Sequence, residues 1–131
     1  MIYAYKSIGL PDNAIKNLLA KNALESGWGK YAQGAYNFGN ITANTKWHGK
    51  YTQGTDKDAS GKKITQKFRV YNSLEEFVRD EIKLLEDYYD FNPNDDFDTF
   101  ISKLQGNNPG NKRYAAAKDY DERVKRVYDR L

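Results

Sequence analysis

The sequence contains no cysteine, and this absence excludes several kinds of functional site. Disulfides, zinc–thiolate centres, iron–sulfur clusters and cysteine nucleophiles are all ruled out. His48 is the only histidine, so a metal site with several histidine ligands is excluded as well. We therefore expect neither a metal ion nor a cofactor, and we expect His48 to pack in a loop rather than to serve a Ser-His-Asp triad.

Long apolar runs are also missing. No 18 apolar residues follow one another, which excludes a membrane-spanning helix, and residues 1–13 lack the apolar core of a signal peptide. The net charge is only +3 and no basic stripe is present, so nucleic acid is not an expected partner. With 131 residues, 39% hydrophobic and 30% charged, the composition predicts one soluble domain over residues 1–131, and we expect a monomer.

Four segments have apolar residues at the spacing of amphipathic helices, namely 12–26, 74–89, about 97–104 and 120–131. Candidate capping side chains stand at their starts: Asp12 or Asn13, Ser73 with Glu76, Asp95 or Asp96, and Asp119 with Glu122. Residues 63–71 alternate apolar and polar positions. Together with residues 50–52 and the turn-rich stretch 54–61, they predict a β-hairpin. The pattern therefore predicts a mainly helical α+β domain with one small β element.

Residues 27–50 form a segment rich in glycine, asparagine and aromatic residues without either period. Large aromatic side chains such as Trp28 and Trp47 are costly to expose without a purpose. We therefore expect this segment to be an ordered, functional loop rather than a flexible linker.

Glu25 is the strongest candidate for a catalytic acid. It lies seven residues after Leu18, which places both side chains on the apolar face of the helix predicted over 12–26. Trp28 follows shortly after. Burial in such surroundings raises the pKa of a carboxyl group and keeps it protonated, as general-acid cleavage of a glycosidic bond requires. The alternative is that Glu25 points outward as a solvated residue at the end of the helix.

Residues 23–41, ALESGWGKYAQGAYNFGNI, closely resemble the signature of the glucosaminidase domain, glycoside hydrolase family 73, which occurs in flagellar peptidoglycan hydrolases, autolysins and phage lysins. Further similarity to family motifs is found at Tyr36–Gly39, Trp47–Lys50, Phe68–Glu76, Tyr114-Ala115 and Tyr120. The resemblance implies a lysozyme-like fold with a β-hairpin lobe. It also implies hydrolysis of the β-1,4 bond between N-acetylglucosamine and N-acetylmuramic acid in peptidoglycan, with Glu25 as the general acid.

The resemblance also implies a second acid in the β element, in a setting like T-x-E. Here the stretch reads GTDKDASG, so Asp56, directly after Thr55, is the first choice and Asp58 the second. Both aspartates could instead form the turn, and attack by the substrate's own acetamido oxygen would need no second acid. The same stretch imitates half of an EF-hand loop, but Lys67 stands where the last ligand would be, so we do not expect calcium.

The motif positions imply a set of substrate-binding residues, in which aromatic rings would stack on sugars. They are Trp28, Tyr36, Asn37, Phe38, Tyr71, Tyr114 and Tyr120. The chain departs from the family pattern at Arg113, where a glycine is usual, and at Ala117, where an aspartate often stands. If Arg113 redirects the backbone, Tyr114 would pack against the last helix near Val124 instead.

Two other functions fit the same residues. One is a muramidase or lytic transglycosylase on the same fold, which also needs one acid. The other is a non-catalytic module that binds the cell wall and does not need Glu25. In each case the expected partner is the glycan strand of bacterial peptidoglycan. The place of action is the cell wall, reached by secretion, through the periplasm or from a phage, with no signal peptide in this chain.

Overall fold

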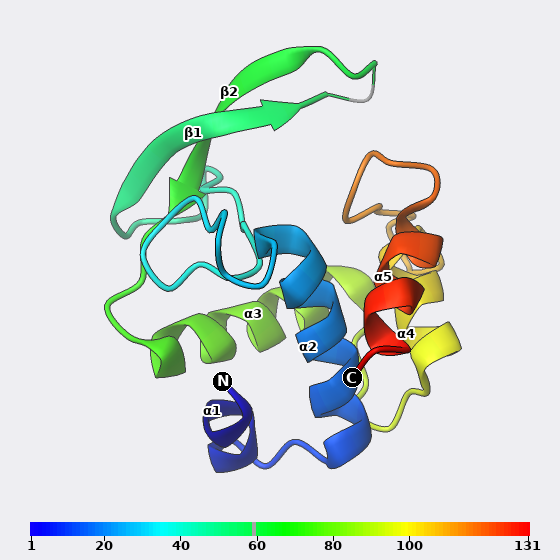
Figure 1. The fold of residues 1–131 in the computed structure, drawn as a ribbon. Helices are drawn as coiled ribbons and strands as arrows, with labels where there is room; N and C mark the ends of the chain where they lie inside the picture. Colours follow the sequence, from blue (N-terminus) through cyan, green and yellow to red (C-terminus); the bar gives the residue numbers. More distant parts are fainter. Residues whose placement is uncertain (59) are drawn as a thin grey trace.

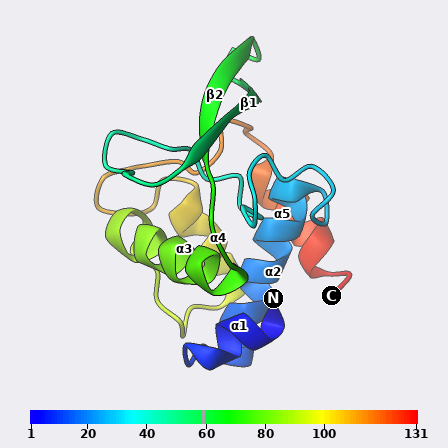
Figure 2. The ribbon, with the colours of Figure 1, turned by 90° about the vertical axis from the view of Figure 1, so that its left-hand side faces the viewer.

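The structure is a computed structural model that describes residues 1–58 and 60–131, and this part of the chain forms five helices and one antiparallel hairpin. In order, the elements are α1 (Ile2–Ser7), α2 (Asp12–Ser26), β1 (Tyr51–Lys57), β2 (Lys63–Arg69), α3 (Leu74–Tyr89), α4 (Phe97–Leu104) and α5 (Tyr120–Tyr128). The helices form one body and the hairpin projects from one end of it (Figure 1). The turned view shows the hairpin standing above α2 and α3, away from both termini (Figure 2). The mainly helical α+β class expected from the sequence is confirmed.

Helix α2 is the central element of the helical body, in contact with α1, α4 and α5. Its buried residues include Leu18 and Ala20, but also the polar Lys21 and Asn22. Gly27 follows the last residue of the helix, and its φ of 57° lies in the left-handed region that glycine adopts without steric cost. The chain therefore turns sharply one residue after the helix ends. None of the described helices is long and apolar enough to cross a membrane.

The expected helix starts are partly confirmed. The Oγ of Ser73 accepts a hydrogen bond from the backbone N–H of Glu76 at 3.1 Å, and a carboxylate oxygen of Asp96 caps α4 in the same way. The caps expected for α2 and α5 are wrong. Helix α2 follows Pro11 without a side-chain cap, and the carboxylate of Asp119 accepts from Arg123 instead of a backbone N–H.

Two further features differ from the sequence-based expectations. Helix α1 was not predicted, because six residues are too few to show a helical period. Strand β1 continues to Lys57, so residues 54–57 belong to the strand rather than to the turn, and Asp56 pairs with Ile64 of β2. The hairpin is therefore longer than the alternation of residues 63–71 indicated.

A buried asparagine holds the loop of residues 27–50 in place. The Nδ2 of Asn37 donates to the carbonyl oxygens of Ile41 (2.9 Å) and Arg69 (3.0 Å), and its Oδ1 accepts from the N–H of Ile41 (2.9 Å). The side chain is completely buried. Asn40 adds a bond from its Nδ2 to the carbonyl oxygen of Glu25 at 2.6 Å. These bonds fix the loop between β2 and the end of α2.

Replacement of Asn37 tests this role. In Asn37→Ala, the carbonyl oxygen of Arg69 and the N–H of Ile41 lose their partner, while the carbonyl oxygen of Ile41 keeps only its bond from the N–H of Arg69. We therefore expect the free energy of unfolding to fall by about 2–4 kcal/mol. Urea denaturation of the wild type and the variant measures the change. Asn107→Ala is the matched control, since its exposed side chain bonds only the hydroxyl of Ser102, and it should change stability by less than about 0.5 kcal/mol. Equal stability of Asn37→Ala and the wild type would contradict the assignment.

Candidate active site

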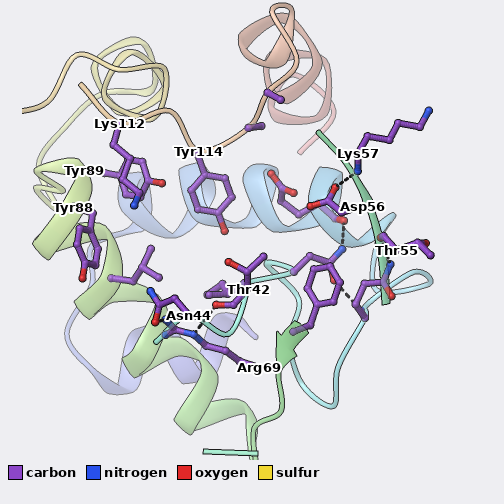
Figure 3. Close-up of a pocket in the computed structure, with 18 of the residues that line it drawn as sticks. Thr42, Asn44, Thr55, Asp56, Lys57, Arg69, Tyr88, Tyr89, Lys112 and Tyr114 are labelled. Atoms are coloured by element: carbon purple, nitrogen blue, oxygen red, sulfur yellow. Dashed lines mark hydrogen bonds between the residues drawn. The ribbon is translucent and has the colours of Figure 1, made fainter. Parts of the chain in front are cut away.

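A cleft of about 470 Å³ lies between the hairpin, the loop of residues 27–50, the end of α3 and the segment before α5. Glu25 lines it from the end of α2, Asp56 from β1, Tyr88 from α3 and Tyr114 from the segment before α5. Figure 3 shows Tyr88 and Lys112 at one side of the cleft and Asp56 at the other, with Tyr114 between them. Residues far apart in the sequence therefore meet around one cavity.

Glu25 lies in the last turn of α2 and is half-buried, so it is not the solvated residue of the alternative interpretation. The hydroxyl of Tyr120 donates a hydrogen bond to its Oε1 at 2.7 Å. Burial raises the pKa of Glu25 above its ordinary value. The ammonium of Lys21 and the Tyr120 hydroxyl oppose this rise, whereas the negative charges of Asp56 and Glu81 add to it.

Lys21 and Glu81 form a buried ion pair beneath the cleft. Their Nζ and Oε2 atoms are 2.9 Å apart, and neither side chain is exposed. The Nζ of Lys21 also donates to the Oδ1 of Asn22 at 3.1 Å and lies 4.3 Å from the ring centre of Tyr114. Burial lowers the pKa of Lys21, but Glu81, Tyr114 and Glu25 together outweigh this effect and the pKa is raised. Lys21 is therefore charged at neutral pH.

Tyr114 forms part of the cleft wall, despite Arg113 before it. Its hydroxyl donates to the carbonyl oxygen of Gly39 at 3.0 Å, and its ring lies 6.3 Å from that of Tyr120 at an interplanar angle of 21°. Burial raises the pKa of Tyr114, so its hydroxyl remains protonated. The Arg113 guanidinium instead donates to the carbonyl oxygens of Gln105 and Ala117. Tyr114 and Tyr120 thus form a stacked pair, in which the ring of Tyr114 lies against Lys21 and the hydroxyl of Tyr120 bonds Glu25.

The two candidate second acids occupy different places. Asp56 lies on the same face of β1 as Thr52 and Gly54, whose partial burial shows that this face is turned toward the protein, and it lines the cleft. Asp58 lies at the hairpin turn and does not line the cleft. Its Oδ1 accepts hydrogen bonds from the Ser60 hydroxyl (2.6 Å), the Lys62 N–H (3.0 Å) and the Ser60 N–H (3.0 Å), which lower its pKa. The turn-forming interpretation therefore describes the geometry of Asp58 and not that of Asp56.

Three of the residues expected to bind substrate form the frame of the site. Asn37 is buried in the loop. The ring of Phe38 packs edge-on against that of Phe77, with the ring centres 6.0 Å apart. Tyr71 is buried, and its hydroxyl donates a hydrogen bond to the carboxylate of Asp80. None of the three lines the cleft. Their places indicate that they support the loop and the start of α3.

Trp28 and Tyr36 also lie outside the cleft lining. Trp28 is 61% exposed and borders a separate apolar groove with Phe38 and Leu131. Tyr36 is 48% exposed on the loop. Of the seven expected substrate-binding residues, the structure thus places Tyr114 at the cleft and Tyr120 in contact with Glu25.

Several cleft residues were not expected from the sequence. Tyr88, Lys112, Asn44 and Thr42 line the cavity from three different segments. Tyr88 precedes the core residue Tyr89, and the helical period gives no sign that it turns toward a cavity. No group of three or more His, Cys, Asp or Glu side chains in the described part of the chain is arranged to hold a metal ion.

Comparison with known proteins decides the family. The glucosaminidase family model, described as mannosyl-glycoprotein endo-β-N-acetylglucosaminidase, matches residues 4–131. The chain belongs to this family. It is 35% identical over 91 residues to the peptidoglycan hydrolase FlgJ of Salmonella typhimurium, and equally similar to FlgJ of Escherichia coli K12. The aligned part covers 63% of this chain but only 28% of those relatives.

Solved structures agree in fold and family. The peptidoglycan hydrolase of Sphingomonas sp. A1 superposes with a TM-score of 0.74 and 29% identity, covering 98% of this chain and 80% of that one. The glycoside hydrolase domain of Salmonella typhimurium FlgJ has a TM-score of 0.67 and 28% identity, and the match covers 99% of this chain and 80% of that domain. The catalytic domain of the autolysin Auto from Listeria monocytogenes shares the fold at 22% identity and a TM-score of 0.66, covering 98% and 76%. The lysozyme-like fold and the glycoside hydrolase class expected from the resemblance are confirmed.

The bond from Tyr120 to Glu25 gives a testable pKa change. Tyr120 donates to the carboxylate and so lowers the pKa of Glu25. In Tyr120→Phe this donor is lost, and we expect the pKa of Glu25 to rise further above its ordinary value. Carbon-13 NMR titration of the Glu25 carboxyl carbon in both proteins measures the change. An unchanged or lower pKa in the variant would show that the bond does not stabilise the carboxylate.

Proposed function

We propose that this chain is an endo-β-N-acetylglucosaminidase that hydrolyses the β-1,4 bond between N-acetylglucosamine and N-acetylmuramic acid in peptidoglycan. The observation that carries the proposal is Glu25, held at the cleft by Tyr120 with a raised pKa. Relatives named as peptidoglycan hydrolases support the choice of substrate. The protein would accordingly act at the bacterial cell wall.

In this mechanism Glu25 donates the proton that lets the glycosidic oxygen leave. Its Oε1 accepts the hydrogen bond from the hydroxyl of Tyr120, so Oε2 is the oxygen that carries the proton to be donated. A raised pKa keeps a larger fraction of Glu25 protonated near neutral pH. Lys21 and Tyr120 limit the rise, so that Glu25 can still give the proton up.

Asp56 activates the water molecule from the hairpin side of the cleft. Its Oδ1 accepts a hydrogen bond from the N–H of Lys57 at 2.8 Å, which orients the carboxylate and leaves Oδ2 to accept from water. Its charge is close enough to contribute to the raised pKa of Glu25, as expected for two carboxylates that border one substrate. Participation of the substrate's acetamido oxygen is the route that would make Asp56 dispensable.

Glu25→Gln tests the assignment of the acid. The amide has nearly the same shape but cannot donate the proton, so we expect the rate of wall hydrolysis to fall by ~10²–10⁴. Dye release from labelled peptidoglycan measures the rate, and thermal unfolding should show a melting temperature near that of the wild type. A correctly folded variant with more than half of the wild-type rate would remove Glu25 from the mechanism.

Asp56→Asn and Asp58→Asn form a matched pair that tests the base. Both remove one negative charge from the hairpin, but only Asp56 borders the cleft. We expect Asp56→Asn to lose most of its turnover on peptidoglycan, whereas Asp58→Asn keeps a rate within about twofold of the wild type. If Asp56→Asn cleaves as fast as the wild type, the acetamido route is correct and Asp56 has no chemical role.

A further inference from the structure

Two lysines converge on Tyr88 at the end of the cleft opposite to Asp56. The Nζ of Lys46 donates to the Tyr88 hydroxyl at 3.1 Å, and its distance to the ring centre is 5.5 Å. The Nζ of Lys112 lies 4.8 Å from the same ring centre. Tyr88 and Lys112 line the cleft that contains Glu25, and Lys46 approaches the tyrosine from outside that lining.

Neither ammonium forms an ion pair with a carboxylate in the described part of the chain. The ring of Tyr88 attracts both cations, yet it cannot neutralise them. Two positive charges are thus held at one place on the wall of a cleft without a negative partner from the protein. Such an arrangement is complementary to an anionic group of a ligand.

The backbone on both sides of this site is fixed. The side chain of Asn108 binds the N–H of Lys112 (2.9 Å) and its carbonyl oxygen (2.8 Å). The Oδ1 of Asn44 accepts from the N–H of Lys46 at 3.1 Å. Tyr88 itself belongs to the last turn of α3. The backbone of Lys46 and Lys112 and the helical position of Tyr88 are therefore defined before any ligand is bound, which reduces the entropy lost on binding.

Acidic residues border the site but form no ion pair with either of its lysines in the described part of the chain. Glu86, Asp87 and Asp90 border the neighbouring hollow together with Lys112. Asp87 is paired with Lys83 at 3.2 Å, and Asp90 is 3.7 Å from Lys103. Lys103 also pairs with Asp95 at 2.7 Å, and Glu86 has no lysine partner among the described residues. Because none of these acids contacts Lys46 or Lys112, both ammonium groups beside Tyr88 are available to an anionic ligand.

We propose that Lys46, Tyr88 and Lys112 form a subsite for a carboxylate of the peptide stem that peptidoglycan carries on its muramic acid residues. The inference rests on the proposed function, because the glycan must occupy the cleft beside Glu25. A peptide stem is attached to every second sugar of the glycan. A strand that lies in the cleft therefore brings the carboxylates of its stems to the end of the cleft where Tyr88 lies. Phosphates of teichoic acids are attached to the wall more sparsely and are not fixed in register with the cleaved bond.

The test compares two substrates and two double variants. The substrates are peptidoglycan with its stems and glycan strands freed of stems by an amidase, both stripped of teichoic acid. Lys46→Ala/Lys112→Ala removes the subsite. Lys6→Ala/Lys118→Ala is the matched control, because it removes the same charge from exposed positions that do not line the cleft. Lys46→Arg/Lys112→Arg keeps the charge.

We expect the subsite variant to show a KM about three- to tenfold higher on stem-bearing peptidoglycan, as the loss of two exposed ion pairs predicts. Its kcat should stay within about twofold, and its kinetics on stem-free strands should equal those of the wild type. The arginine variant should keep most of the affinity, and the Lys6/Lys118 control should be unchanged on both substrates. No change, or an equal loss on both substrates, would overturn the proposal.

Two further measurements separate the sources of failure. Calorimetric binding of a soluble disaccharide with and without its peptide reports on the subsite without any cleavage. If the wild type cleaves neither substrate but binds the peptide-bearing fragment through Lys46 and Lys112, the proposed function fails and the subsite stands. The second measurement repeats the kinetics on walls that retain teichoic acid. If the lysines matter only on those walls, the anion is a phosphate and the stem proposal is wrong.

Discussion

The buried ion pair between Lys21 and Glu81 is the interaction on which the active site depends. It joins α2 to α3 without any exposure to solvent, and the hydroxyl of Tyr5 from α1 donates to the second carboxylate oxygen of Glu81. Asn22 connects the same hydroxyl to α2 through a bond of 2.7 Å. Breaking a buried pair of this kind typically costs about 3–5 kcal/mol, because the remaining charge has no partner. These contacts therefore hold α1, α2 and α3 together.

The same ion pair connects the fold to the chemistry. Lys21 precedes Glu25 by one helical turn, and its ammonium lies against the ring of Tyr114. Tyr114 stacks near Tyr120, which donates to Glu25. Burial raises the pKa of Glu25, and the positive charge of Lys21 is the largest influence that opposes this rise. One lysine thus stabilises the helical body and lowers the pKa of Glu25, the proposed general acid.

Local patterns predicted the hairpin and every described helix except α1, but not the contacts between distant segments. The helix over 74–89 and the place of Glu25 follow from spacing along one helix. Lys21 and Glu81 are sixty positions apart, and an isolated lysine in a helix gives no sign that it will be buried. Asn37 was interpreted as a substrate contact because it belongs to a motif, yet the loop needs an amide at that position for its own backbone. Motif membership indicates importance without separating binding from support.

The most direct test of the proposed activity is mass spectrometry of the new reducing ends released from purified peptidoglycan. Protonation by Glu25 of the bond after N-acetylglucosamine predicts products that end in reducing N-acetylglucosamine. Products that end in reducing muramic acid would identify a muramidase, and anhydro-muramic acid would identify a lytic transglycosylase. Either of these results, or the absence of any new end with folded protein, would contradict the account.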